Sequence, residues 1–252
     1  LLLVIAGWNG SDISSVECFD FRTGLWKRES GAGGGSSGIP DLPRERSFVG
    51  VALFHEQVYV IGGCLHNEPV RFVDIYDIRS NSWSLGPDLR CKRDEVGVAT
   101  LGGKLYAIGG FSDDRALSSA EVLNDPSGTW SFIASLSCSR RRFGVAVLGG
   151  RIYAIGGQNI QGFLSSGEYY DPLSNAWTRI ADMGFPRCWV SACALNNRIY
   201  VVGGKIDSNT YTSNVEFYNP ETNNWTATTD LNAERGSAGQ NSLASTPSPI
   251  TR

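Results

Sequence analysis

A glycine pair recurs along this chain at a constant interval of 47 residues. An apolar run that contains a tyrosine precedes each pair, and a tryptophan follows each pair after 20 or 21 residues. A period of this length is typical of solenoids, propellers and other repeat architectures. The pairs are Gly62-Gly63, Gly109-Gly110, Gly156-Gly157 and Gly203-Gly204, and the tryptophans are Trp83, Trp130, Trp177 and Trp225.

A variant of the same pattern at the N-terminus adds a fifth unit. Ala6-Gly7 takes the place of the glycine pair, and Trp26 follows 19 residues after Gly7. The step from Gly7 to Gly63 is longer, 56 residues, because a Gly/Ser-rich stretch is inserted at 30–38. Such a composition offers no core-forming side chains, so it predicts a flexible loop.

Each unit carries the pattern of four short antiparallel strands. In the fourth unit, apolar runs at 142–148 and 151–155 flank a Gly-Gly turn, an alternating segment covers 168–171, and a last strand begins at 176. Aromatic and β-branched residues dominate these runs, and turn residues separate them. No window shows a helical apolar stripe of sufficient length. The sequence therefore predicts an all-β protein.

Four-stranded units of this size cannot bury both faces alone, so they must pack on one another. Radial packing around an axis gives a β-propeller. The repeated glycines suit close backbone approach near the axis. We expect the tryptophans to fill the gaps between blades together with Phe19, Tyr76, Leu123, Tyr170 and Tyr218.

The repeated residues resemble the Kelch repeat. The glycine pair is followed by Tyr-Asp six residues before the tryptophan, as in Tyr76-Asp77 and Tyr170-Asp171. The segment from Gly7 to Asp20 looks like the first Kelch blade of the BTB-Kelch (Kelch-like) proteins. The resemblance covers essentially the whole chain. Departures are Ala6 for glycine, Asn124 and Asn219 for aspartate, Leu123 for tyrosine, and Ser191 where the other units have Gly50, Gly97 and Gly144.

The resemblance implies a ring of usually six blades, whose first innermost strand comes from the C-terminus. Two interpretations are open: a five-bladed ring closed by a weak strand at 235–244, or an incomplete piece of a longer propeller, which we favour. The predicted domain spans 1–244, followed by a disordered tail at 245–252. Its units are 1–29, 46–88, 93–136, 140–183 and 187–230.

Composition indicates a cytoplasmic protein, with nuclear or cytoskeletal association also compatible. A net charge of −3 disfavours a general nucleic-acid surface, and no apolar run approaches the 18 residues of a membrane span. The six cysteines form no CxxC pair, which fits free thiols in a reducing compartment. They are Cys18, Cys64, Cys91, Cys138, Cys188 and Cys193.

The sequence shows no constellation typical of catalysis. Its two histidines, His55 and His66, have no recurring partner at ligand spacing, and the glycine runs precede no helix that could hold a phosphate. Asp113, Asp114 and Asp182 fall in predicted loops. We therefore expect no enzyme activity, no cofactor and no metal.

Function is expected at the loops of one propeller face, since loops on a rigid scaffold are the usual seat of binding. Two sets of repeated positions point to the same face. The first directly follows each glycine pair: Trp8, Cys64, Phe111, Gln158 and Lys205. The second precedes each innermost strand: Arg46-Ser47, Arg93-Asp94, Arg140-Arg141, Arg187-Cys188 and Arg235-Gly236.

The repeated arginine has two interpretations. It caps turn carbonyls or pairs with a neighbouring blade, or it binds acidic side chains of a peptide. In similar Kelch propellers the substrate peptide docks on this face through arginines and serines at these positions. The resemblance thus implies Arg46, Ser47, Arg93, Arg140, Arg141, Arg187, Trp8, Phe111, Gln158 and Lys205 as contact candidates. Trp8 and Phe111 suit hot-spot anchors, and Cys138 near the arginines is a candidate redox-sensing thiol.

We expect a protein-interaction module. The resemblance implies substrate recognition for a Cullin-3 ubiquitin ligase, with Cullin-3 bound through a BTB region that is not part of this sequence. The alternative within the family is actin binding. A metal-carrying oxidase propeller is a third hypothesis, which the scarcity of histidine disfavours.

Overall fold

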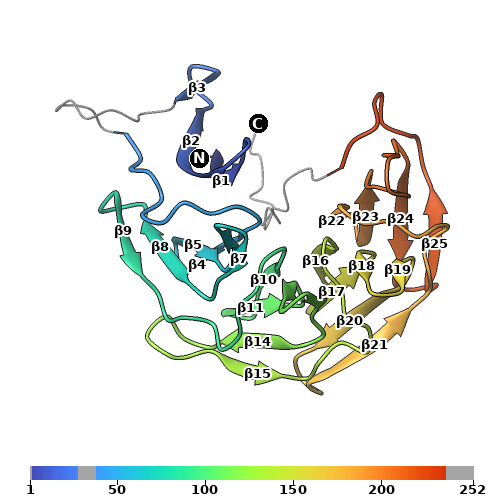
Figure 1. The fold of residues 1–252 in the computed structure, drawn as a ribbon. Coiled ribbons are helices and arrows are strands. Elements are labelled where there is room, and N and C mark those ends of the chain that lie inside the picture. The colour runs from blue at the N-terminus through green and yellow to red at the C-terminus, as the bar shows by residue number, and fades with distance from the viewer. Residues whose placement is uncertain (1, 28–37, 237–252) are drawn as a thin grey trace, which may run out of the picture.

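The computed structural model describes residues 2–27 and 38–236 (Figure 1). Five antiparallel sheets follow one another around a common centre, which confirms the all-β propeller fold. The sheets of units 2 to 5 have four strands, and the sheet of unit 1 has three. Within the described ranges, no helix has the length and hydrophobicity needed to cross a membrane.

The strands are short and match the predicted apolar runs. Unit 1 contains β1 (Leu2–Trp8), β2 (Asp12–Asp20) and β3 (Leu25–Lys27). Unit 2 contains β4 (Gly50–Phe54), β5 (Gln57–Ile61), β8 (Val73–Asp77) and β9 (Ser82–Leu85). Unit 3 contains β10 (Gly97–Leu101), β11 (Lys104–Ile108), β14 (Ala120–Leu123) and β15 (Ser131–Ile133). Unit 4 contains β16 (Gly144–Leu148), β17 (Arg151–Ile155), β20 (Gly167–Asp171) and β21 (Ala176–Ile180). Unit 5 contains β22 (Ser191–Leu195), β23 (Arg198–Val202), β24 (Val215–Asn219) and β25 (Asn224–Ala227).

Every four-stranded sheet has the order of its sequence, with the first strand nearest the centre and the fourth outermost (Figure 1). The first two strands form a tight hairpin. In unit 4, Leu148 pairs with Arg151 across Gly149 and Gly150, whose φ values are 58° and 74°. Positive φ at both turn residues is what a two-residue hairpin requires, and glycine adopts it without a steric cost.

The predicted tryptophans join consecutive units by hydrogen bonds as well as by packing. The indole Nε1 of Trp130 donates to the Pro87 carbonyl at 2.9 Å, and that of Trp177 donates to the Ala134 carbonyl at 2.8 Å. Trp83 and Trp225 make the equivalent bonds to residues 43 and 44 positions earlier. A buried indole needs such a partner. Each outer strand is therefore fixed to the segment just before its own unit.

Glycine begins the inner strand wherever the next blade comes closest. A Cβ added at Gly97 would lie 2.6 Å from Val145 Cγ2, and one added at Gly144 would lie 2.7 Å from Ala192 Cβ. Neither distance is compatible with van der Waals contact. Ser191 takes this position in unit 5, and no described inner strand follows it in the ring.

The hydrophobic core is divided among the interfaces between neighbouring units. One cluster joins units 2 and 3 through Tyr59, Leu105 and Trp130, and the next joins units 3 and 4 through Tyr106 and Tyr170. A third cluster joins units 4 and 5, and a smaller one joins units 1 and 2. The blades are thus held by mutual burial, as predicted from their size.

Several predicted segments lie outside the described residues. These are most of the Gly/Ser-rich stretch, the closing strand from residue 237 onward, and the tail at 245–252. Of the closing segment the structure describes Arg235 and Gly236. The Arg235 carbonyl accepts a 2.9 Å hydrogen bond from the Gly204 amide, as the Arg187 carbonyl does from the Gly157 amide.

Candidate protein-interaction face

The two predicted sets of loop positions meet at one end of the ring. In units 2 to 5 an arginine precedes the innermost strand. The residue after that arginine forms a β-bridge with the residue after the glycine pair. The bridges are Ser47–Cys64, Asp94–Phe111, Arg141–Gln158 and Cys188–Lys205. In units 2 to 4 a short ribbon extends this loop: β6 (Cys64–Leu65) with β7 (Glu68–Pro69), β12 (Phe111–Ser112) with β13 (Arg115–Ala116), and β18 (Gln158–Asn159) with β19 (Gly162–Phe163).

The four repeated arginines Arg46, Arg93, Arg140 and Arg187 are fully buried. The prediction that their side chains contact a partner is therefore wrong. The alternative interpretation holds: they pair with groups inside the fold. Ser47 is also buried, with 1% of its surface exposed, so it is no surface contact either.

Each buried arginine forms an ion pair with a carboxylate on the third strand of its own unit. Nη2 of Arg93 lies 2.9 Å from Glu121 Oε1, and Nη2 of Arg140 lies 2.9 Å from Glu168 Oε1. Arg46 pairs with Asp74 and Arg187 with Glu216. Burial lowers the pKa of Arg46 and of Arg187, and the neighbouring carboxylate opposes that shift. The arginines thus have a structural role, as charged partners of buried carboxylates within each unit.

The same groups also satisfy backbone atoms at the loops. Nη1 of Arg140 donates to the carbonyls of Gly156 at 2.8 Å and Ser166 at 3.0 Å. Glu168 accepts from the amides of Ser137 and Cys138. A buried ion pair is tolerated better when further hydrogen bonds satisfy its atoms. Here Arg140 Nη1 and the Glu168 oxygens are bonded, whereas Arg140 Nε has no partner among the described residues. One arginine and one carboxylate therefore hold three loop segments of a unit together.

A sequence signal for this network was available. An acidic residue follows each arginine by 28 or 29 positions, two residues before the aromatic position of the third strand. These residues are Asp74, Glu121, Glu168 and Glu216. A carboxylate that recurs with its arginine in every unit indicates a scaffold pair.

The other predicted contact residues differ in exposure. The guanidinium of Arg141 lies over the Phe111 ring, 4.4 Å from its centroid, and Gln158 accepts a 3.1 Å hydrogen bond from Arg142. The Lys205 ammonium lies 5.5 Å from the Tyr211 ring centroid. Trp8, at the end of β1, is 56% exposed. These five residues remain candidates for partner contact.

Sequence reasoning missed a second set of residues, two positions after each buried arginine. Phe48, Glu95, Arg142 and Trp189 form what we call the mouth cluster. All four have left-handed backbones, with φ between 47° and 57°, which is uncommon for residues other than glycine, asparagine and aspartate. Arg142 Nε donates to Glu95 Oε1 at 2.8 Å, and its guanidinium lies 4.6 Å from the Trp189 ring.

Backbone bonds tie the mouth cluster together across units. The Glu95 amide donates to the Phe48 carbonyl at 3.0 Å, and the Trp189 amide donates to the Arg142 carbonyl at 2.7 Å. One position adopts the left-handed conformation in each of units 2 to 5 and carries a different side chain in each. The scaffold therefore fixes the backbone here and leaves the side-chain chemistry variable, which is the property of a recognition surface.

Asp94 lies beside this cluster and is 7% exposed. Burial, followed by repulsion from Glu95, raises the pKa of Asp94 to about 7. Arg141 and Arg142 oppose this shift without reversing it. At neutral pH the Asp94 carboxyl group is therefore divided between its protonated and ionised forms.

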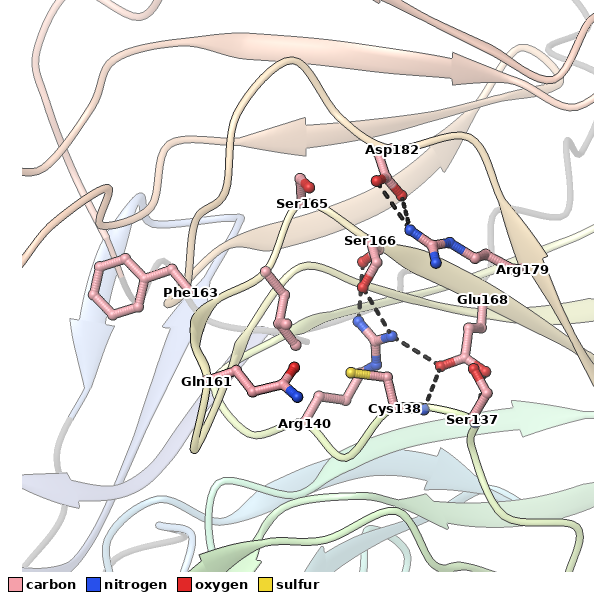
Figure 2. Close-up of a pocket in the computed structure, with 11 residues that line it drawn as sticks. Ser137, Cys138, Arg140, Gln161, Phe163, Ser165, Ser166, Glu168, Arg179 and Asp182 are labelled. Atoms are coloured by element: carbon pink, nitrogen blue, oxygen red, sulfur yellow. Dashed lines mark hydrogen bonds and ion pairs between the residues drawn. The ribbon is translucent and has the colours of Figure 1, made fainter.

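A polar pocket of about 260 Å³ opens over unit 4 (Figure 2). Arg140 and Glu168 line it together with Cys138, and the exposed pair Arg179–Asp182 lies at one side, with both carboxylate oxygens 3.0 Å from Arg179 Nη2. The Cys138 thiol accepts a 3.3 Å hydrogen bond from Asn159 Nδ2. The volume suits an amino-acid side chain rather than a large cofactor.

The β18–β19 ribbon joins the pocket to the mouth cluster. Asn159 contacts Cys138 of the pocket, while Gln158 contacts Arg142 of the mouth cluster. At the ribbon tip Ile160 is 97% exposed. An aliphatic side chain presented in this way, between the unit 4 pocket and the mouth cluster, suits contact with a partner protein.

Across residues 2–27 and 38–236, no three His, Cys, Asp or Glu side chains lie close enough together to hold a metal ion.

Comparison with known proteins agrees with this architecture. The model of the Kelch motif matches residues 1–31, 45–90, 92–137, 139–184 and 186–232. Because these matches cover most of the chain, the protein belongs to the Kelch-repeat family, whose propellers serve protein–protein interaction. The chain is 30% identical over 77 residues to Kelch-like protein 22 of Homo sapiens. That match covers 30% of this chain and 11% of the human protein.

Proposed function

We propose that this protein recognises a segment of a partner protein on the face formed by the mouth cluster, the β18–β19 ribbon and the unit 4 pocket. The observation that carries the proposal is the contrast between scaffold and surface. The buried arginine–carboxylate pairs repeat in units 2 to 5. The mouth-cluster residues, two positions after each arginine, have a different side chain in each of these units. Variable side chains on a repeated, rigid backbone suit one particular partner.

The finer proposal is substrate recognition for a Cullin-3 ubiquitin ligase. The support is the Kelch repeat itself and the likeness to a Kelch-like protein. Cullin-3 would be contacted through a BTB region outside these 252 residues, and ubiquitin transfer would take place on partner proteins. The expectation of an acidic peptide rested on four arginines that are buried. The proposal is therefore for a polar segment, and it does not specify the charge of that segment.

A matched pair of variants tests the proposed face. Ile160 and Leu173 are both aliphatic turn residues, 97% and 98% exposed. Ile160 lies at the tip of the β18–β19 ribbon, and Leu173 lies in the β20–β21 turn at the opposite end of the sheet. Ile160→Asp and Leu173→Asp therefore add the same charge to opposite faces, with little effect on folding.

The measurement is quantitative affinity purification and mass spectrometry with the wild-type chain and both variants. We expect partner proteins that Leu173→Asp retains and Ile160→Asp loses. Cullin-3 substrates among them would support the ligase role, and actin among them would favour a cytoskeletal one. If both variants recover the wild-type set, the face proposed here is not the binding surface.

A further inference from the structure

The residue two positions before each buried arginine covers the ion pair beneath it in at least two units. In unit 5 the ring of Phe185 lies over the Arg187 guanidinium, with 4.5 Å between the ring centroid and Cζ. In unit 2 the side chain of Arg44 donates to both oxygens of Asp74, the acid of the buried pair, at 2.6 and 3.2 Å. In units 2 to 5 this position is Arg44, Cys91, Cys138 and Phe185.

In unit 4 the polar pocket lies at this place. Cys138 has the position of Phe185, and it lines the pocket together with Arg140 and Glu168, the buried pair of its unit (Figure 2). A thiol is much smaller than a phenyl ring. The pocket therefore corresponds to the space that the Phe185 ring fills in unit 5.

The pocket offers an occupant both apolar and polar side chains. Leu164 and Cys138 are partly exposed in its wall, and Ser137 and Gln161 are exposed at its rim. Figure 2 shows the Gln161 side chain extending toward Cys138. A free cysteine packs as a small hydrophobic residue. This combination suits an amphipathic ring, whose body is apolar and whose edge or hydroxyl can meet polar groups.

The charges that line the pocket cancel one another. They are two arginines and two carboxylates, paired as Arg140 with Glu168 at 2.9 Å and Arg179 with Asp182 at 3.0 Å. A charged side chain that entered would lose its hydration and meet no free counter-charge. An uncharged occupant is therefore favoured.

Unit 5 is a closer precedent for this occupant than unit 2. The acids of units 4 and 5, Glu168 and Glu216, both accept backbone amides from the loop beside them. Unit 2 has the shorter Asp74, which leaves its oxygens to Arg44. A guanidinium entering the unit 4 pocket would find the carboxylate engaged, whereas a ring such as that of Phe185 requires no free acceptor.

We propose that the unit 4 pocket receives an aromatic side chain of the partner segment, which takes the place that Phe185 has in unit 5. The ring packs on Cys138 and Leu164, and the rim presents Ser137 and Gln161 to a tyrosine hydroxyl or an indole N–H. Aromatic residues are the usual anchors of protein interfaces. The inference rests on the proposed function and specifies the type of residue that this face recognises.

Selection from a library of random 12-residue peptides displayed on phage, with the wild-type chain as target, tests this inference. Enriched peptides are then titrated against two variants. Cys138→Phe gives unit 4 the residue of unit 5 and fills the pocket from within. Cys91→Phe adds the same ring at the equivalent position of unit 3, outside the proposed face. Urea unfolding checks that both variants fold, and Cys138→Leu replaces Cys138→Phe if that variant does not.

We expect the wild-type chain to enrich peptides with one phenylalanine, tyrosine or tryptophan at a fixed position. Those peptides should bind Cys138→Phe at least about tenfold more weakly, because the variant's own ring excludes theirs. They should bind Cys91→Phe within about twofold of wild type. Replacing the aromatic residue of the peptide by alanine should weaken binding to the wild-type chain by a similar factor and should have little effect on binding to Cys138→Phe.

Two results would overturn the aromatic pocket and leave the proposed face intact. The enriched peptides could lack a fixed aromatic residue, or they could bind Cys138→Phe as tightly as wild type, while in either case losing affinity for Ile160→Asp. Enrichment of no peptide would also overturn the aromatic pocket. The purifications with Ile160→Asp and Leu173→Asp would then still decide the proposed function.

Discussion

The rings of Phe48 and Trp189 lie with their centroids 5.9 Å apart, although they belong to units 2 and 5. Both residues occupy the same repeat position, two residues before the first residue of an inner strand. Their contact therefore crosses the centre of the ring, where the units come closest together. The Arg142 guanidinium also lies over the Trp189 ring. The mouth cluster thus links units that share no strand.

We expect the Phe48–Trp189 contact to contribute about 0.5–1.5 kcal/mol to stability, as aromatic pairs do. A double-mutant cycle with Phe48→Ala and Trp189→Ala, followed by urea unfolding, measures this coupling. The control cycle pairs Phe48→Ala with Leu173→Ala, whose effects should add because the two sites lie at opposite ends of the fold. A coupling near zero in the first cycle would mean that the rings do not meet in solution.

The buried arginine pairs predict a second, larger effect. Arg93→Met leaves the Glu121 carboxylate in the interior without its cation, so we expect a loss of about 3–5 kcal/mol in the free energy of unfolding. The pair is fully buried. Chemical denaturation with the variant and the wild-type protein measures the loss.

Arg71→Met is the matched control for that experiment. Arg71 pairs with Asp88 at 3.3 Å, but the two side chains are 58% and 43% exposed. Solvent screens such a pair, so its removal should cost less than about 1 kcal/mol. Equal losses in the two variants would contradict a structural role for the buried network.

Much of this fold could be predicted from sequence because its units repeat. The glycine pairs and tryptophans recur at a fixed stride, and each position has one physical cause. A Cβ at Gly109 would lie 2.7 Å from the Arg140 carbonyl oxygen, and the Trp130 indole donates a hydrogen bond to a carbonyl of the neighbouring segment. A residue type that recurs in every unit serves the structure that all units share. Such regularity therefore indicates a structural role.

The candidate site could not be predicted in the same way. One interpretation of the repeated arginine was a surface that contacts a partner. Its repetition, together with a carboxylate 28 or 29 residues later, instead indicates a buried ion pair. The mouth cluster escaped notice because its four side chains have nothing in common except a left-handed backbone. Backbone conformation at residues such as Phe48 and Trp189 is set by loop closure, which no local sequence pattern reveals.

Gly144 provides a test of the close approach between inner strands. Gly144→Ala would place a Cβ 2.7 Å from Ala192 Cβ, so we expect a destabilisation of about 1–3 kcal/mol from overpacking. Adding Ala192→Gly removes the atom that clashes. Thermal unfolding should show the double variant to be more stable than the sum of the two single changes, and strict additivity would contradict the clash.

Asp94 predicts a dependence of stability on pH. Its folded-state pKa of about 7 is above the ordinary value of 3.8, so the native protein binds more protons between those two values than the unfolded chain. The contribution of this group to stability is therefore fully present below about pH 3.8 and is lost as pH rises from there through about 7. Glu95 strengthens the effect, and Arg141 and Arg142 weaken it.

Asp94→Asn removes that titration. We expect the variant to match the wild-type protein below about pH 4 and to gain on it as pH rises through about 7. At pH 8 the variant should be more stable by about 1–2 kcal/mol, after allowance for solvent at the carboxyl group. Unfolding curves at pH 4, 5, 6, 7 and 8 measure the difference, with Asp114→Asn as a control that should show no such trend. A difference independent of pH would mean that Asp94 already has a cationic partner within the chain.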